Sequence, residues 1–403
     1  MATLKQTQKD RPKKSTSTFV FIIAILFFAM TLRTPITGVG PIIGEIREGL
    51  GISNVLAGFL TTIPLLAFAF VSPFVPGISR KFGMEKTLYY SIILLTIGIA
   101  LRSFGTILLL IFGTALIGIA ISFGNVLMQG FFKLKYPYHI GLLTGIYTVS
   151  MNVSAGVALG ISHPIASNPA FGWQGALASS IIITIITLIV WIPLLRGEKV
   201  DLSSLGASNN KEKEQKLWHS PLAWAIAIAM GFQSLLFYCS TTWLPEILIS
   251  QGFTESSAGW MTSIMQYSQL PMTFLIPILS ERLKSQRPIV YFFTACYLVA
   301  FIGIYFKWTQ LTALWMVFLG LAGGASFGLV LMFFTLRTKT AYEAAQISGF
   351  AQSVGYLLAA VGPVLFGYLH DATLSWELPI ILFILSSIIL FVTSYISAKE
   401  RYL

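Results

Sequence analysis

Long apolar segments alternate with short polar ones along almost the whole chain. A membrane-spanning helix needs about 20 consecutive, mostly apolar residues, and twelve segments meet that requirement. The pattern therefore predicts an all-α membrane protein with twelve transmembrane helices. The expected spans are 18–42, 54–76, 86–103, 106–132, 140–163, 174–195, 220–244, 258–280, 289–306, 310–336, 345–369 and 376–397.

The pattern repeats itself after about half of the chain. Residues 122–128 read Ser-Phe-Gly-Asn-Val-Leu-Met and residues 326–332 read Ser-Phe-Gly-Leu-Val-Leu-Met, so six of seven positions recur at an offset of 204. A second stretch recurs at an offset of 201, beginning at Glu45 and at Glu246. The chain is therefore expected to consist of two related halves, an arrangement typical of transporters that bind their substrate between the halves.

A polar segment separates the two halves. Residues 196–219 are rich in glycine, serine and asparagine and contain a Lys-Glu-Lys-Glu run, a composition typical of a flexible linker. We expect a cytoplasmic basic tail at 1–17, a six-helix bundle at 18–195, this cytoplasmic linker, a second six-helix bundle at 220–397 and a C-terminal tail at 398–403.

Composition and charge agree with a membrane protein. Charged residues make up 10% of the chain, against about 25% in soluble domains. Of the 26 lysines and arginines, 22 fall in segments on one predicted side of the membrane, and only Arg47, Arg102 and Lys307 fall on the other. Because such a bias marks the cytoplasmic side, both termini are expected to be cytoplasmic, in the cell membrane. The net charge of +11 thus reports topology and not a nucleic-acid partner.

Motifs for energy transduction or catalysis are missing from the sequence. There is no phosphate-binding Gly-x-x-x-x-Gly-Lys loop, no His-Glu-x-x-His, no Cys-x-x-Cys and no nucleophile elbow. We therefore expect neither an ATP-driven pump nor an enzyme, and no cofactor or metal. An intramembrane enzyme is disfavoured by the lack of paired catalytic groups. A channel or receptor is disfavoured by the duplication around a flexible linker.

The arrangement of six spans, a polar loop, six more spans and a basic motif after the second span of each half resembles the major facilitator superfamily. The family motif runs roughly Gly-x-Leu-Ala-Asp-Arg-x-Gly-Arg-Arg. The first copy lies at 76–86, where Lys81, Gly83 and Lys86 match and Arg80 replaces the acid.

The second copy of this motif lies at 277–284, where Glu281 and Arg282 match and the glycine is lost. The resemblance implies that the motif acts in gating, by charges that stabilise the outward-facing state. The alternative is that its cations only set the topology. The gating residues implied are Arg80, Lys81, Gly83, Glu281 and Arg282.

The first span is similar, more narrowly, to the cyanate and 2-nitroimidazole porter branch of this superfamily. Residues 32–41 follow the branch pattern Leu-Arg-x-x-Ile-x-x-Val-Gly-Pro. The resemblance implies two pseudo-symmetric six-helix bundles, alternating access, a small-molecule substrate and a monomer. It also implies a cavity lined by spans 1, 2, 4, 5, 7, 8, 10 and 11. Proton coupling rests on the resemblance alone, with His163 and Asp371 at outer span ends as its candidates.

Arg33 is the single formal charge deep inside a predicted span. It lies roughly 21 Å and 13 Å from the two ends of its span, at 1.5 Å per residue. A lone arginine at that depth costs about 2.5–3.5 kcal/mol on insertion scales, and no Asp or Glu is expected at mid-span. We interpret Arg33 as an anchor for an anionic or strongly polar substrate. The alternatives are a guanidinium bound to backbone carbonyls near Pro35, or a misplaced span boundary.

Uncharged polar side chains at span depth are the other candidates for substrate binding. Amides in membrane helices often act only as links between helices. Spans 3, 6, 9 and 12 contain no Asn or Gln in their apolar runs, which favours a cavity role for those elsewhere. These candidates are Asn125, Gln129, Tyr147, Asn152, Gln233, Tyr238, Gln266, Gln352 and Tyr356.

Glycines four residues apart predict close helix packing. One row is Gly320, Gly324 and Gly328, and another is Gly156 and Gly160. Taken together, the sequence predicts a secondary transporter of a small polar or anionic solute. A drug or toxic-compound efflux carrier of the same fold is the alternative, because the chain is rich in aromatic residues (14%).

Overall fold

The computed structural model describes residues 18–52, 54–195 and 217–402. The predicted tail 1–17 and most of the predicted linker therefore lie outside the described residues. The helices in order are α1 (Thr18–Thr37), η1 (Gly40–Ile42), α2 (Ile43–Leu50), α3 (Asn54–Val71), η2 (Ser72–Phe74), α4 (Val75–Phe82), α5 (Met84–Arg102), α6 (Ile107–Lys135), α7 (Ile140–Ala166), α8 (Gly172–Ala178), α9 (Ile181–Leu195), α11 (Pro221–Ser250), α12 (Glu255–Arg282), α13 (Arg287–Tyr305), η3 (Thr309–Leu311), α14 (Thr312–Leu336), α15 (Ala341–Thr373) and α16 (Glu377–Ser397).

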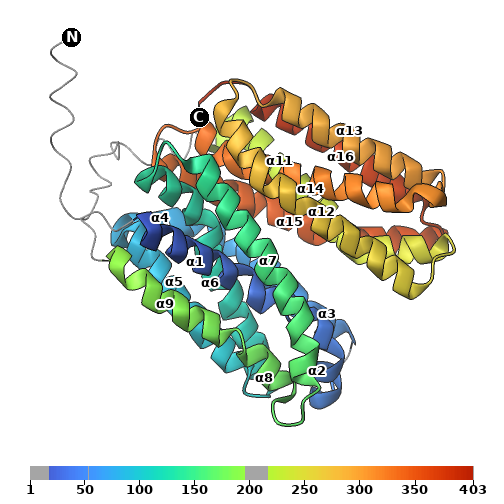
Figure 1. Cartoon of the computed structure of the whole chain (residues 1–403), viewed down its shortest axis with the longest axis horizontal. Coiled ribbons are helices and arrows are strands. Elements are labelled where there is room, and N and C mark those ends of the chain that lie inside the picture. Colours follow the sequence, from blue (N-terminus) through green and yellow to red (C-terminus); the bar gives the residue numbers. More distant parts are fainter. Residues whose placement is uncertain (1–17, 53, 196–216, 403) are drawn as a thin grey trace.

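The helices form two bundles that lie at an angle to each other (Figure 1). The N-terminal bundle contains α1 to α9 and the C-terminal bundle contains α11 to α16. Within the described residues, eleven helical segments are long and apolar enough to cross a membrane. The remaining long helix, α12, has 28 residues but is less apolar, because it carries several polar side chains. The predicted twelve-helix, two-bundle fold is confirmed.

Three of the predicted spans are interrupted instead of continuous. The first was expected to run to residue 42, but α1 ends at Thr37 and a 3-10 turn leads into α2. Proline and glycine explain the break, since Gly40 begins that turn and Pro41, which follows it, cannot donate a backbone hydrogen bond. The second span breaks at η2, which contains Pro73. The sixth divides into α8 and α9.

The two glycine rows behave differently. A Cβ atom at Gly320 would collide with the carbonyl of Met265, and one at Gly324 with the carbonyl of Gln269. The row on α14 therefore allows α12 to approach closely, as predicted. By contrast, a Cβ atom at Gly156 would meet no other atom within 4 Å. The same holds at Gly160, so the packing prediction for the row on α7 is wrong in this conformation.

The bundles contact each other at one end, which we call the closed end. It comprises the last turns of α6, α12 and α14 and the first turns of α7 and α15. There Glu281 of α12 accepts hydrogen bonds from the backbone N–H groups of Ile140 (3.0 Å) and Gly141 (2.9 Å) of α7. Lys133 of α6 donates to the backbone carbonyls of Thr335 (2.7 Å) and Thr338 at the end of α14. Glu281 thus gives hydrogen-bond partners to free N–H groups at the start of α7, and Lys133 does so for free carbonyls at the end of α14. In both cases the bond crosses from one bundle to the other.

The opposite, open end lacks such contacts among the described residues. Gly145, near the start of α7, would place a Cβ 2.9 Å from the Phe274 carbonyl of α12. Gly156 follows eleven residues later, about three helical turns, and so lies on the same face of α7 with nothing near it. On α12, Trp260 is 70% exposed. The helices α7 and α12 are therefore packed at the closed end and separated at the open end, as the diverging bundles in Figure 1 also show.

Candidate functional site

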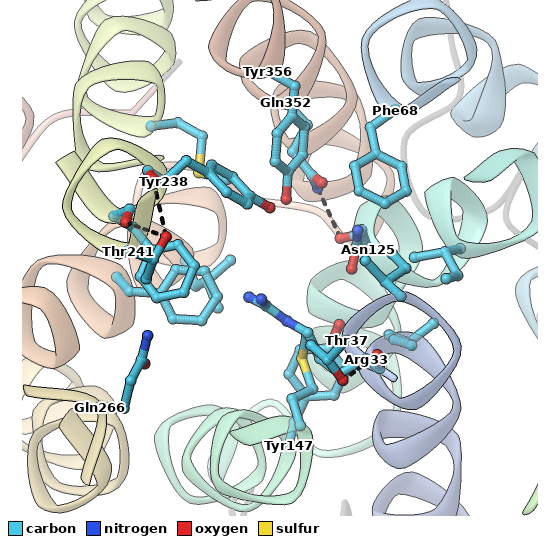
Figure 2. Close-up of a pocket in the computed structure, with 18 residues that line it drawn as sticks. Arg33, Thr37, Phe68, Asn125, Tyr147, Tyr238, Thr241, Gln266, Gln352 and Tyr356 are labelled. Atoms are coloured by element: carbon cyan, nitrogen blue, oxygen red, sulfur yellow. Dashed lines mark hydrogen bonds between the residues drawn. The ribbon is translucent and has the colours of Figure 1, made fainter. Parts of the chain in front are cut away.

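A cavity of about 230 Å³ lies between the two bundles. It is lined from α1, α3, α6 and α7 of the N-terminal bundle and from α11, α12, α14 and α15 of the C-terminal bundle. These are spans 1, 2, 4, 5, 7, 8, 10 and 11, the set that the family resemblance implied. Figure 2 shows the cavity with its lining side chains. No Asp, Glu, Lys or His belongs to the lining among the described residues.

The packing of α1 places Arg33 in this cavity. Phe28, Ala29 and Leu32 are fully buried against the rest of the N-terminal bundle. Arg33 and Thr37 are one turn apart and share the remaining face, and both line the cavity. The Thr37 hydroxyl donates to the backbone carbonyl of Arg33 (3.0 Å), which satisfies a carbonyl near the end of α1.

The guanidinium of Arg33 makes one recorded contact, with an aromatic ring. Its Cζ atom lies 5.8 Å from the centre of the Phe237 ring, within cation–π range. Within the described part of the chain, the guanidinium forms neither an ion pair nor a hydrogen bond with a side chain or a backbone carbonyl. Arg33 thus lies in neither of the two alternative settings, a lipid-facing surface or a carbonyl cage at Pro35. Its hydrogen-bond donors remain available to the cavity.

Most of the predicted polar residues come together around Arg33. The members that line the main cavity are Asn125, Tyr147, Tyr238, Gln266, Gln352 and Tyr356. A second, small cavity of about 20 Å³ adjoins Arg33 and is lined by Asn152 and Gln233 in addition to Tyr238 and Tyr356. A volume of this size holds about one water molecule.

Two amides at this site already have partners. Gln352 donates through Nε2 to the backbone carbonyl of Asn125 (2.8 Å) and to the hydroxyl of Ser348 (2.9 Å). Because Asn125 belongs to α6 and Gln352 to α15, the bond joins the bundles beside the cavity. Gln266 accepts a bond from the Gln269 amide (2.9 Å) within α12. Both side chains are therefore fixed in orientation before any ligand arrives.

Gln129 lies outside both cavities. It is 1% exposed, and its Oε1 accepts a bond from the Thr144 hydroxyl (3.1 Å). Its Nε2 is buried without a partner in the described residues. Gln129 follows Asn125 by four residues, so the two share a broad face of α6. However, Gln129 lies one turn nearer the closed end, where α7 covers it.

Aromatic and hydroxyl residues of the lining were missed by the sequence reasoning. Phe68, Phe237 and Phe327 face the cavity, as do Thr37 and Thr241. In a chain with 31 phenylalanines, composition does not separate rings that face a cavity from rings that face lipid. For the threonines a signal was present, since Thr37 lies one turn beyond Arg33 on the same helix face.

The predicted gating residues lie at the closed end but differ in their contacts. Glu281 binds the start of α7, as described above. Arg80 approaches the ring of Tyr342, at the start of α15, with 5.9 Å between Cζ and the ring centre. Lys81 and Arg282 are exposed. Gly83 has φ +85°, a backbone conformation that favours glycine, and it joins α4 to α5.

Lys133 was not singled out from the sequence, although it bridges the bundles. Its Nζ also contacts the Thr338 hydroxyl (3.1 Å). The neighbouring Lys135 forms an ion pair with Glu85 (2.6 Å) inside the N-terminal bundle. The duplication could have pointed to Lys133, because a basic residue, Arg337, recurs at the equivalent position of the second half, 204 residues later. Arg337, however, binds within its own bundle, to Ser397.

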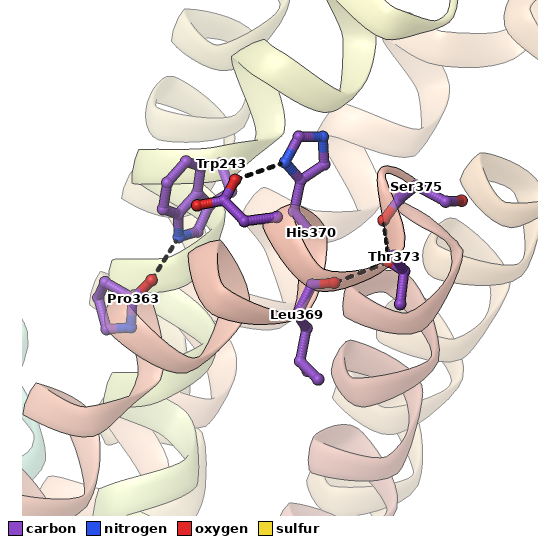
Figure 3. A network of polar contacts seen from close by, with 7 residues as sticks. Trp243, Pro363, Leu369, His370, Thr373 and Ser375 are labelled. Carbon is purple, nitrogen blue, oxygen red and sulfur yellow. Dashed lines mark hydrogen bonds and ion pairs between the residues drawn. The ribbon is translucent and has the colours of Figure 1, made fainter.

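The two candidates for proton coupling lie at the open end, each in a His–acid pair. His163 Nδ1 lies 2.8 Å from Glu45 Oε1. His370 Nδ1 lies 3.3 Å from Asp371 Oδ1, and the His370 ring stacks on Trp376 at 4.1 Å between centres. Figure 3 shows the second pair beside the Trp243–Pro363 hydrogen bond. Neither pair belongs to the lining of the central cavity.

Comparison with curated proteins places this geometry among transporters. The chain is 42% identical over 391 residues to the uncharacterized transporter YycB of Bacillus subtilis (strain 168), covering 97% of this chain and 96% of that protein. It is 37% identical to the 2-nitroimidazole transporter of Escherichia coli (strain K12), covering 95% and 96%. It is 21% identical to the cyanate transport protein CynX of the same organism, covering 87% and 90%.

The fold itself recurs in solved structures. The Escherichia coli fucose:proton symporter FucP superposes with a TM-score of 0.75 at 11% identity, covering 96% of this chain and all of that one. At this identity the likeness concerns the fold alone. The family model described as Major Facilitator Superfamily matches residues 19–363. The chain is therefore a multi-pass membrane transporter of the Major Facilitator Superfamily, similar to the branch that contains the 2-nitroimidazole and cyanate transporters.

Proposed function

We propose that this protein is a secondary transporter that moves a small polar or anionic solute by alternating access, with Arg33 as the substrate anchor. The observation that carries the proposal is the guanidinium of Arg33, which lies in the cavity between the bundles, over the Phe237 ring and without a hydrogen bond or ion pair to any of the described residues. A buried arginine at membrane depth is costly without water, a partner or a ligand. An anion or a strong acceptor entering the cavity offsets that cost with charge-assisted hydrogen bonds.

The distribution of lysine and arginine supports a cytoplasmic position for the closed end. The polar ends of α4, α6 and α12 carry Arg80, Lys81, Lys133, Lys135 and Arg282. By the positive-inside rule this end faces the cytoplasm, with both termini on that side of the cell membrane. The conformation described here is then outward-open. Residues 18–195 and 220–397 act as two bundles joined by a cytoplasmic linker at 196–219.

Contacts at the closed end support a gating role for the basic motif. Glu281 places a carboxylate on the N-terminus of α7, where the partial positive charge of a helix favours an anion. The same bond must break when the cytoplasmic side opens. Arg80, Lys81, Gly83 and Arg282 surround this region, and we propose that they set the balance between the outward-open and inward-open states.

We propose that the solute is as small and as polar as the molecules for which the relatives are named. The 2-nitroimidazole and cyanate transporters are named for small molecules with electron-rich acceptor atoms. A cavity of about 230 Å³ is smaller than the sites of about 300–1,000 Å³ that hold drug-sized ligands. Efflux of a compact aromatic compound remains the second candidate, because the rings of Phe68, Phe237 and Phe327 line the same cavity.

A thermal-shift screen of the purified protein tests the anchor. The panel consists of cyanate, nitrate, 2-nitroimidazole and small carboxylates, each of which raises the melting temperature if it binds the folded state. Loss of a charge-assisted bond costs about 1.5–3 kcal/mol, so Arg33→Gln should raise the concentration needed for a given shift roughly 10- to 150-fold. Lys399→Gln removes an exposed cation outside the cavity and serves as the control.

Equal ligand responses of wild type and Arg33→Gln would remove the anchor. The direction of transport is tested separately, with right-side-out and inverted vesicles. An importer accumulates the hit from the screen only in right-side-out vesicles, and an exporter only in inverted ones. The second result would select the efflux candidate.

A further inference from the structure

Two buried tyrosines in the cavity have no hydrogen-bond partner within the described residues. Tyr147 is 3% exposed and Tyr356 is 8% exposed, and no side chain or carbonyl of those ranges bonds their hydroxyls. A buried tyrosine hydroxyl normally finds a partner. Tyr297, which is equally buried but lies outside the cavity, bonds the Ser326 hydroxyl at 3.3 Å. The unpaired hydroxyls thus coincide with the cavity, where Tyr238 adds a third.

The hydroxyls of Tyr238 and Tyr356 point into the same space as the guanidinium of Arg33 (Figure 2). Arg33, Tyr238 and Tyr356 line the main cavity together and also meet at the small cavity beside it. Arg33 belongs to α1 of the N-terminal bundle. Tyr238 belongs to α11 and Tyr356 to α15 of the C-terminal bundle. Three groups from both bundles therefore surround one volume.

The free polar groups in this volume are mainly hydrogen-bond donors. The guanidinium supplies five N–H donors and no acceptor, and each tyrosine supplies one O–H donor. Gln352 adds one acceptor, its Oε1, because its amide N–H groups are already directed to Asn125 and Ser348, and the donors remain in excess. With one positive charge and no acid in the lining among the described residues, the site matches a single anionic group. A carboxylate offers two coplanar acceptor oxygens and fits the planar fork of arginine.

The walls of the cavity are flat and apolar. The Phe68 ring packs on the Tyr356 ring with 5.0 Å between centres, and Phe237 lies beneath the guanidinium. Phe327 closes another side. A volume of about 230 Å³ exceeds the roughly 150 Å³ of an engineered apolar cavity that binds benzene. This space holds one six-membered ring beside a carboxylate, and offset or edge-on contact with the walls favours an aromatic ring.

We propose that Tyr238 and Tyr356 are specificity-determining residues, whose hydroxyls complete with Arg33 a cradle for the carboxylate of a small, flat aromatic monoanion. This inference rests on the proposed function of Arg33 as substrate anchor. Because the donors come from both bundles, the bound carboxylate links α1 to α11 and α15. Binding thereby couples recognition of the anion to the relative position of the bundles.

Isothermal titration of the purified full-length protein tests the cradle with three probes. Benzoate is the flat monoanion, benzamide is its neutral analogue of the same shape, and cyclohexanecarboxylate is the anion with a saturated ring. Benzoate should bind at least tenfold more tightly than either analogue. Tyr238→Phe and Tyr356→Phe should each weaken benzoate roughly 10-fold or more, since a hydrogen bond to a charged group is lost, and should leave benzamide unchanged. Tyr267→Phe, at a position 67% exposed, is the control.

Each outcome decides a different part of the proposal. Loss of benzoate binding in Arg33→Gln, together with unchanged binding in both tyrosine variants, overturns the cradle and leaves the anchor. Equal affinity for cyclohexanecarboxylate overturns the aromatic requirement. No binding of benzoate to the wild type overturns the cradle as a whole, and Arg33-dependent binding of cyanate would then still support the proposed function. If Arg33→Gln leaves the affinity for benzoate unchanged, the proposed function itself is overturned.

Discussion

At the scale of single residues, depth in the membrane was the most useful signal. Arg33 could be selected from the sequence because it is the one charge far from both ends of a span, and the structure places it in the cavity. Which way its neighbours face could not be decided in the same way. Asn125 and Gln129 lie one turn apart on α6, yet only Asn125 lines the cavity. The difference depends on which helix covers each turn, and that is a property of the packed bundles.

Replacement of Arg33 by lysine separates charge from shape. Lysine keeps the positive charge but loses the planar fork that binds two acceptor oxygens at once. We expect Arg33→Lys to lower the affinity of an anionic ligand about 10-fold, which corresponds to about 1.4 kcal/mol. Arg33→Ala should abolish measurable binding. Binding by titration and transport in vesicles, at matched amounts of folded protein, provide the measurement. Normal transport by Arg33→Ala would exclude the anchor.

Replacement of Gln129, unlike that of Arg33, should not weaken ligand binding. Its Nε2 is buried without a partner in the described residues, and a buried unsatisfied amide is unfavourable by about 1–3 kcal/mol. Leucine has a similar volume and no polar group. We therefore expect Gln129→Leu to keep or raise the melting temperature and to leave ligand affinity unchanged. A loss of affinity comparable to that of Arg33→Gln would show that Gln129 reaches the substrate in another conformation.

At the scale of helices, apolar length predicted where spans occur but not where they break. Interruptions at Pro41 and Pro73 have a sequence cause, yet Pro277 lies inside the continuous helix α12, where it leaves the carbonyl of Thr273 without its helical partner. A proline breaks a helix or only bends it according to the neighbours that satisfy the freed carbonyl. The bond from Thr148 of α7 to the carbonyl of Thr273 (2.8 Å) is such a neighbour contact in α12, and local sequence does not encode it.

The contact between α12 and α7 through Glu281 is proposed to hold the closed end together. Glu281→Gln retains a hydrogen-bond acceptor but removes the charge at the start of α7, where an anion contributes about 0.3–1 kcal/mol and up to about 2 kcal/mol in partly buried sites. We expect the population to shift toward the inward-open state by roughly 2- to 30-fold. Lys399→Gln, which removes an exposed cation near the C-terminus, should cause no comparable shift.

A cysteine-labelling assay measures that shift. A single cysteine introduced at Ala345, in a background without Cys239 and Cys296, is protected while the bundles remain in contact, because Ala345 is fully buried and packs against Gly130 of α6 at the closed end. Its rate of reaction with a water-soluble maleimide should rise in the Glu281→Gln background and stay unchanged in the Lys399→Gln background. An unchanged rate in both backgrounds would mean that Glu281 does not hold the gate.

At the scale of the whole molecule, the duplication predicted the architecture but not its asymmetry. Two six-helix bundles follow from the recurrence of residues 122–128 at 326–332. The single difference between those segments falls at Asn125, which lines the cavity, whereas its repeat Leu329 is fully buried. Lys133 likewise crosses to the other bundle, while its repeat Arg337 does not. The halves have thus diverged at the cavity and at the closed end, and only a structure shows which divergences face the cavity.

The uncovered glycine row on α7 gives the alternating-access proposal a direct test. Gly156 shares a helix face with Gly145, which packs on α12, but no atom lies within 4 Å of its Cβ position in this conformation. If the open end closes as the bundles rock, α7 and α12 must approach each other there, and small residues permit close approach. Gly156→Leu should therefore leave the fold and ligand binding in the outward-open state intact, because the space is available. It should reduce transport at least tenfold, because closure is obstructed.

The matched control for this variant is Val157→Leu, which adds one methylene group at a neighbouring position that is 55% exposed. Melting temperature and ligand affinity should equal those of the wild type in both variants, and only Gly156→Leu should lose transport. Such a separation of binding from turnover is what obstruction of one conformational step produces, since a ligand that binds the outward-open state does not require closure. Wild-type transport by Gly156→Leu would mean that α7 and α12 do not approach at this level, and that the substrate crosses by a motion other than closure of these two helices.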